Sequence, residues 1–141
     1  MATSTVDVVI AAPRDVVYKF FTERDGINAH LPFVQFTLKK PGSPTPEGVG
    51  AQYVVGRGGI GIVEETTKLV PGERMEYKIV KGAPVKRHVG IVTFSDAESG
   101  GTRVSYTMES EPSLPVPAKA VEAGLRVLIN QFIKGTQKAF S

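Results

Sequence analysis

The feature of this sequence that most constrains its fold is the order of the predicted elements. A strand over Ser4–Ile10 comes first, a short helical stretch follows, then a run of strands, and one long helix over about 117–140 closes the chain. A single helix that follows a run of antiparallel strands covers one face of their sheet, because both elements have an apolar side to bury. If the sheet is curved, the gap between sheet and helix is a natural binding place for apolar molecules.

Alternation of apolar and polar residues predicts the strands. The clearest case is 74–80, where Met75, Tyr77 and Ile79 alternate with charged residues. Further strands are predicted over 33–39, 49–55, 60–69, 85–94 and 102–109. Turns rich in glycine and proline separate them without a helix, which indicates antiparallel pairing. We therefore expect an α+β fold, with a curved antiparallel sheet of about six to seven strands and the C-terminal helix packed across it.

Helical spacing appears at two places. After the first strand, Pro13 occupies a typical first helical position, and apolar residues recur until Gly26 ends the helix. A second short turn is predicted over 27–31, so one or two short helices follow the first strand. In the closing helix the predicted apolar stripe consists of Val121, Leu125, Leu128 and Phe132, widened by Ile129, Ile133 and Phe140.

Composition excludes several classes of protein. A chain of 141 residues is one domain by length, so we treat 1–141 as a single domain. Its apolar runs are far shorter than the roughly 20 residues of a membrane-spanning helix. Without cysteine there is no disulfide, thiol nucleophile or thiolate metal site. The first residues lack a secretory signal, and a cytoplasmic location is therefore expected.

The charge pattern does not indicate a nucleic-acid partner. The formal net charge is +3, and most basic residues stand singly beside an acid. Lys81, Lys86 and Arg87 form the densest basic group, around one predicted hairpin. No basic stripe with stacking aromatic residues accompanies it, as nucleic-acid binding would require.

Five segments carry a resemblance to a known family. They are 11–18, 48–51, 70–77, 88–94 and 101–106. In this order they resemble the START-like (SRPBCC) superfamily, whose helix-grip fold is shared with the plant allergen Bet v 1. Within it the chain is most similar to the bacterial polyketide cyclase/dehydrase and lipid-transport family. The resemblance implies a cavity for a hydrophobic ligand. Members include aromatase/cyclases, lipid carriers, quinone-binding proteins and chaperone regulators, so the fold by itself does not identify the ligand.

One departure from the family concerns the cavity mouth. Members often carry a tryptophan near the end of the second helical stretch, whereas this chain contains none. The segment 30–33, His-Leu-Pro-Phe, stands there instead, and it implies a differently shaped mouth.

The pocket is expected between the concave face of the sheet and the closing helix. Its predicted walls are Tyr77, Ile79, Val92, Phe94, Val104, Tyr106, Leu125, Leu128 and Phe132. Tyr53 is a further candidate, because a buried phenol needs a hydrogen-bond partner that a ligand oxygen can supply. For the tyrosines the alternative is core packing. Arg57 would meet an anionic head group at the entrance, or it is simply solvated on its turn.

Glu64 and His88 are the candidate acid–base residues. Glu64 and Glu65 are adjacent on a strand, so one of them faces inward. If Ile60, Ile62 and Thr66 face the cavity, Glu64 does too, and it would serve as an acid, a base or a hydrogen-bond anchor. Alternatively the inward glutamate pairs with a basic side chain, or both glutamates reach solvent. His88 shares a face with Val92 and is either a ligand contact or a core residue.

The segment 56–61, Gly-Arg-Gly-Gly-Ile-Gly, matches the dinucleotide fingerprint G-x-G-x-x-G. That motif needs a helix directly after it, whose N-terminus holds the pyrophosphate. Here the following residues read as a strand, and a flexible hairpin is the favoured interpretation. Two histidines without ligand spacing make a metal site unexpected, and no cofactor is indicated.

Three functions remain open at this level. The first is binding of one small hydrophobic or amphipathic ligand, such as a lipid, quinone or polyketide, by a monomer or weak homodimer that does not insert stably into membranes. The second is a polyketide-type cyclase or dehydratase that uses Glu64 or His88 for proton transfer. The third is a partner-binding module with a filled cavity, which tight internal packing would favour.

Overall fold

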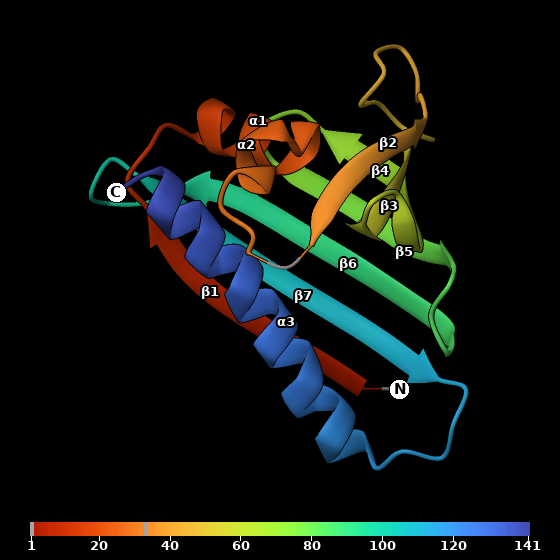
Figure 1. Cartoon of the computed structure of the whole chain (residues 1–141). Helices are drawn as coiled ribbons and strands as arrows, with labels where there is room; N and C mark the ends of the chain where they lie inside the picture. The colour runs from red at the N-terminus through yellow and green to blue at the C-terminus, as the bar shows by residue number, and fades with distance from the viewer. Residues whose placement is uncertain (1, 33) are drawn as a thin grey trace.

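The computed structural model describes residues 2–32 and 34–141 and contains a seven-stranded antiparallel sheet crossed by a long helix (Figure 1). The strands lie in the order β1-β7-β6-β5-β4-β3-β2. Their bounds are β1 Ala2–Ile10, β2 Gln35–Lys40, β3 Gln52–Arg57, β4 Ile60–Val70, β5 Arg74–Lys81, β6 Val85–Asp96 and β7 Thr102–Pro112. The predicted α+β helix-grip fold and its antiparallel pairing are confirmed.

The long helix α3 (Ala118–Ala139) lies diagonally over β1 and β7 (Figure 1). Its inward face buries Leu125, Ile129 and Ile133, which are 5%, 0% and 4% exposed. The hydroxyl of Ser4 on β1 donates a hydrogen bond of 2.7 Å to the carbonyl of Glu122 and ties the helix to the edge of the sheet. Burial of an aliphatic side chain contributes about 1.5–3 kcal/mol, so this apolar stripe is what holds the helix in place.

Two short helices, α1 (Arg14–Glu23) and α2 (Asp25–Asn28), cover the upper part of the same face (Figure 1). In α1, Val17 and Phe21 are buried, and the Phe21 ring meets the Phe94 ring of β6 edge to face at 5.6 Å. The side chain of Asn28 bonds the backbone N–H and C=O of Phe36 at 2.7 and 2.9 Å, which joins α2 to the edge strand β2. These contacts close the space between α3 and β2.

Some predicted boundaries and faces differ from the structure. The third strand begins at Gln52 rather than Val49, because residues 48–51 form a turn in which Ala51 N–H donates to Gly48 C=O. Leu128 was predicted to line the pocket, but it is 46% exposed, because the sheet covers a narrower arc of α3 than the apolar stripe spans. Phe33, the predicted start of the second strand, lies outside the described residues. Among the described residues no helix is long and apolar enough to cross a bilayer.

Candidate functional site

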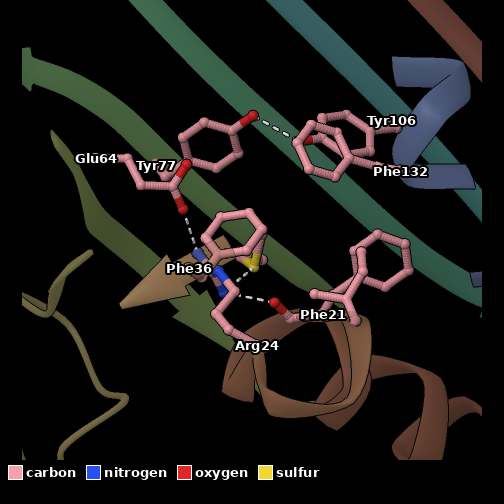
Figure 2. A pocket seen from close by; sticks show the side chains of 9 residues that line it. Phe21, Arg24, Phe36, Glu64, Tyr77, Tyr106 and Phe132 are labelled. Carbon is pink, nitrogen blue, oxygen red and sulfur yellow. Dashed lines mark hydrogen bonds and ion pairs between the residues drawn. The ribbon is translucent and has the colours of Figure 1, made fainter. Parts of the chain in front are cut away.

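A buried ion pair lies between the helices and the sheet. Arg24, directly after α1, has a positive φ of 71°, an uncommon conformation for a residue other than glycine. Its guanidinium Nη2 donates to Oε1 of Glu64 on β4 over 2.7 Å, and the two side chains are only 4% and 7% exposed (Figure 2). A positive charge from the end of a helix thus meets a negative charge from the middle of a strand, away from bulk water.

Further hydrogen bonds and two aromatic rings stabilise the charge of Arg24. Nη1 donates to the carbonyls of Phe21 and Thr22, and the guanidinium lies 4.6 Å from the centre of the Tyr53 ring and 5.3 Å from that of Phe36. Burial by itself lowers the pKa of Arg24, but attraction to and hydrogen bonding with Glu64 outweigh it, and the pKa is raised above its usual value. The guanidinium therefore keeps its charge beside Glu64 inside the apolar core.

Two tyrosine hydroxyls meet beside this pair. Tyr77 on β5 and Tyr106 on β7 approach to 2.5 Å between their oxygens, and Phe132 of α3 stacks on the Tyr106 ring (Figure 2). Burial raises the pKa of both phenols well above the usual value, so both stay neutral at physiological pH. One hydroxyl donates to the other, and the accepting hydroxyl keeps its own proton. That proton is a hydrogen-bond donor with no partner among the described residues.

Gly90 provides the space for the Tyr77 ring. The two residues face each other on β6 and β5, and a Cβ atom at position 90 would overlap the ring. We expect Gly90→Ala to lower the free energy of unfolding by about 1–3 kcal/mol, the usual cost of overpacking a core. The matched control is Gly124→Ala in α3, where no atom lies within 4 Å of the added Cβ and a gain of about 0.5–1 kcal/mol is expected. Urea unfolding measures both, and equal stability of the two variants would contradict a tight fit at Gly90.

The polar groups line a small cavity between the sheet and α3. Its walls are Phe21, Arg24, Ile27, Phe36, Glu64, Met75, Tyr77, Tyr106 and Phe132. The volume open to a water-sized sphere is about 10 Å³, room for about one water molecule. Two buried hydroxyls, of Tyr53 and Thr66, have no hydrogen-bond partner among the described residues. Neither residue lines the cavity itself, but Tyr53 lies against Arg24, and Thr66 faces Tyr77 in the pairing of β4 with β5, so unsatisfied polar groups border the site.

The structure brings together only some of the predicted site residues. Glu64, Tyr77, Tyr106 and Phe132 line the cavity, and Tyr53 lies against Arg24. Val92, Phe94, Val104 and Leu125 are buried in the adjoining core instead, as are Ile10 and Val17. Ile79 is half-buried outside the cavity wall, and Arg57 is exposed on the β3–β4 hairpin.

His88 is buried but does not line the cavity. It is 6% exposed on the same face of β6 as Val92, and burial lowers its pKa. In the pairing of β6 with β7 it faces Ser110, whereas Tyr106 of the cavity lies four residues away along β7. His88 and Glu64 therefore do not lie in one cavity as an acid–base pair.

Of the two adjacent glutamates it is Glu64 that faces inward, and it pairs with a basic side chain, which was one of the alternatives left open. Thr66 is 1% exposed and Glu64 5%, but Ile60 is 81% exposed. Ile60 lies at the tip of the β3–β4 hairpin, and the register with β5 shifts between Val63 and Glu64. The alternation therefore does not continue to the end of the strand.

The glycine-rich match to the dinucleotide motif is a hairpin turn. Gly58 and Gly59 have φ of 60° and 76°, the backbone conformation that a two-residue hairpin requires, and β4 follows directly. Because no helix starts there, the motif lacks the context for pyrophosphate binding. Among the described residues no three His, Cys, Asp or Glu side chains gather as metal ligands.

Sequence analysis missed five lining residues, which are Phe21, Arg24, Ile27, Phe36 and Met75. Arg24 is the most important of them, and a signal for it exists. It stands three residues after Phe21 and seven after Val17, so it continues the buried face of α1 past the end of the helix. A charged residue in phase with an apolar face predicts a buried partner of opposite charge.

Comparisons with known proteins agree with this architecture. A family model described as polyketide cyclase / dehydrase and lipid transport matches residues 1–139. None of the curated proteins matches the sequence. A START superfamily protein from Mycobacterium smegmatis has a TM-score of 0.83 at 10% identity, over 99% of this chain and 97% of that one.

Two further solved structures share the fold. The protein XoxI from Bacillus cereus has a TM-score of 0.78 at 17% identity, over 99% of this chain and 96% of that one. Ara h 8.0201 has a TM-score of 0.71 at 12% identity, over 97% and 96%. At such low identity these similarities establish the fold alone.

Proposed function

The chain belongs to the polyketide cyclase/dehydrase and lipid-transport family, and from this we propose that it binds one small amphipathic molecule between its sheet and α3. The observation that carries the proposal is the buried polar cluster of Arg24, Glu64, Tyr77 and Tyr106 among apolar cavity walls. The oxygen-bearing end of the ligand would bind this cluster. Its apolar part would pack against Phe36 and the other aromatic walls.

A need for stability does not explain the ion pair. Removing two charges from water costs several kcal/mol per ion, and an apolar pair of similar size is often as stable or more stable. A polar anchor for a ligand explains why charges are kept at this place. The unshared tyrosine proton and the partnerless hydroxyl of Tyr53 support the same proposal, because each can donate to a ligand carbonyl, carboxylate or hydroxyl.

Binding requires the cavity to enlarge. Sites for small molecules usually measure about 300–1,000 Å³, far above the volume of about 10 Å³ here. We propose that α2 and β2 move outward as one wall, since β2 is an edge strand paired only with β3 and is tied to α2 through Asn28. The side chains of Ile27 and Phe36 would move with this wall and expose the polar cluster.

Native mass spectrometry of the purified protein, followed by denaturing extraction, tests the proposal. A retained lipid, quinone or polyketide is the expected result. Displacement of 1-aminoanthracene by oleate, a short-chain ubiquinone and an anthraquinone then ranks the ligand classes. A clean mass together with failure of all three displacements would contradict ligand binding.

The tyrosine pair provides a specific prediction for the ligand that displaces the probe best. Tyr106→Phe removes a hydroxyl from the cavity. We expect the Kd of that ligand to rise about five- to tenfold, which corresponds to the loss of one hydrogen bond. Tyr18→Phe is the matched control, because Tyr18 packs edge to face on Phe94 outside the cavity wall. Equal affinities in the two variants would show that the pair does not contact the ligand.

The small cavity volume favours a second candidate, the partner-binding module with a filled interior. In that case the Arg24–Glu64 pair would be purely structural, and neither retained ligand nor displacement would be found. The cyclase or dehydratase alternative has less support, because Glu64 is engaged by Arg24 and His88 lies outside the cavity.

A further inference from the structure

One end of the sheet has an unusual charge pattern. Three connecting segments, 54–63, 79–88 and 112–121, contain no aspartate or glutamate. Their basic residues are Arg57, Lys81, Lys86, Arg87 and Lys119, all of them exposed. We call these three segments the basic end.

The three segments are neighbours in space. A Cβ atom added at Gly82 would lie 3.0 Å from the Cα of Ile62, so the β5–β6 turn lies against the β3–β4 hairpin. The backbone N–H of Ser113 donates to the carbonyl of Pro84 at 2.9 Å, which joins the β7–α3 loop to the same turn. Figure 1 shows the β5–β6 turn, the end of β7 and the start of α3 together at the lower right of the view.

The basic end also exposes large aliphatic side chains. Ile60 is 81% exposed at the hairpin tip, Leu114 61%, Val116 43% and Val80 42%. Single exposed apolar residues need no explanation, but here several of them lie on adjoining segments beside basic residues. Exposed aliphatic side chains flanked by basic residues are typical of surfaces that enter the interface of an anionic bilayer.

The opposite end of the sheet is different. Its turns and short helices carry the acidic residues Asp15, Glu23, Asp25, Glu73, Asp96 and Glu98. The same end also carries the basic residues Arg14, which is paired with Asp96 at 3.4 Å, Lys19, Arg103, Lys134 and Lys138, so its charges are mixed. Near the basic end, acids are found at Glu109, paired with Arg87 at 3.5 Å, at Glu111, also on β7, and at Glu122 near the start of α3, and all three are half-buried. The three segments that carry the exposed aliphatic side chains thus contain basic residues and no acid, whereas the opposite end contains both.

We infer that the basic end docks on the surface of a bilayer containing anionic lipids, with Ile60 and Leu114 in the interface and the lysines on lipid head groups. Each basic residue near such a surface contributes about a fivefold gain in binding, and the aliphatic tips add their own burial. Nucleic acid fits the surface less well, because the three segments contain no Phe, Tyr or Trp on which a base would stack, and their one histidine, His88, is buried. The docking is peripheral and needs no spanning helix.

A single-tryptophan reporter tests the insertion. The chain has no tryptophan, so Ile60→Trp creates the only one. With vesicles of phosphatidylcholine and phosphatidylglycerol we expect a blue shift of its emission and quenching by brominated lipid. With phosphatidylcholine alone we expect neither. The control is Val16→Trp, at a site of α1 that is 43% exposed at the opposite end and is expected not to respond. Equal responses of the two reporters, or none from Ile60→Trp, would overturn the inference.

The charge contribution is tested with the same vesicles. Lys81→Gln is expected to weaken vesicle binding about fivefold, whereas Lys19→Gln on α1 should leave it unchanged. Binding should also fall as salt is added, because the Debye length shrinks. Equal losses in the two variants would overturn the assignment to this end. Since the vesicles carry no added ligand and ligand displacement is measured without vesicles, either hypothesis can fail while the other stands.

Discussion

Glu64→Leu should lower the free energy of unfolding by about 3–5 kcal/mol, because the Arg24 guanidinium would remain buried without its counter-charge. The guanidinium cannot lose its proton to avoid this cost. Urea unfolding of the variant and the parent protein measures the difference. The matched control is Glu65→Leu, one residue along the strand, where the half-buried carboxylate meets Gln52 at 2.9 Å and Lys78 at 4.0 Å. We expect the control to change stability by less than about 1 kcal/mol.

The double variant Arg24→Met/Glu64→Leu tests whether the loss of stability comes from a buried charge left without its partner. With both charges gone, no buried charge is left alone, and most of the lost stability should return. Simple addition of two large losses in the double variant would contradict this, and it would show that each side chain acts through its own packing.

The same double variant should lose ligand affinity by about 10- to 100-fold although it is folded. A hydrogen bond to a charged group contributes about 1.5–3 kcal/mol, and the substitutions remove both charged groups that we propose for the ligand's polar end. The measurement is displacement of 1-aminoanthracene by the ligand that binds the parent protein best. Val127→Ala, 57% exposed on the outer face of α3, is the control and should bind like the parent.

Either outcome of that experiment is informative. Loss of affinity in a stable double variant would assign the pair to ligand recognition. Unchanged affinity would show that the pair has a purely structural role and would favour the partner-binding module with a filled interior. Stability and binding are therefore measured on the same preparation.

Most of the fold could be predicted from the sequence, because it depends on local patterns. Alternation at 74–80 predicted β5, and the long apolar stripe predicted α3, since each period exists only in one type of element. The turn at 56–61 was also predictable, because two consecutive glycines suit a hairpin that needs positive φ at both positions.

The site was only partly predictable. The two tyrosines followed from strand periodicity, which also showed that either Glu64 or Glu65 faces inward, but it did not decide between the glutamates or identify any partner. The pair of Arg24 and Glu64 joins positions 40 residues apart, and it depends on the backbone turn after α1 that points the arginine inward. Leu128 was misplaced for a related reason, since a stripe shows which side of a helix is apolar but not how far the sheet extends beneath it.

The sequence by itself determined the element order, the antiparallel sheet and the helix that covers it, because apolar period and turn residues act over a few neighbours at a time. Only the tertiary structure decided that the gap beneath α3 is nearly filled, that Arg24 pairs with Glu64 inside it, and that His88 lies outside it. Cavity volume and buried pairing result from side chains that converge from distant strands and helices. The volume of the cavity and the buried pairs therefore depend on the positions of all the elements together.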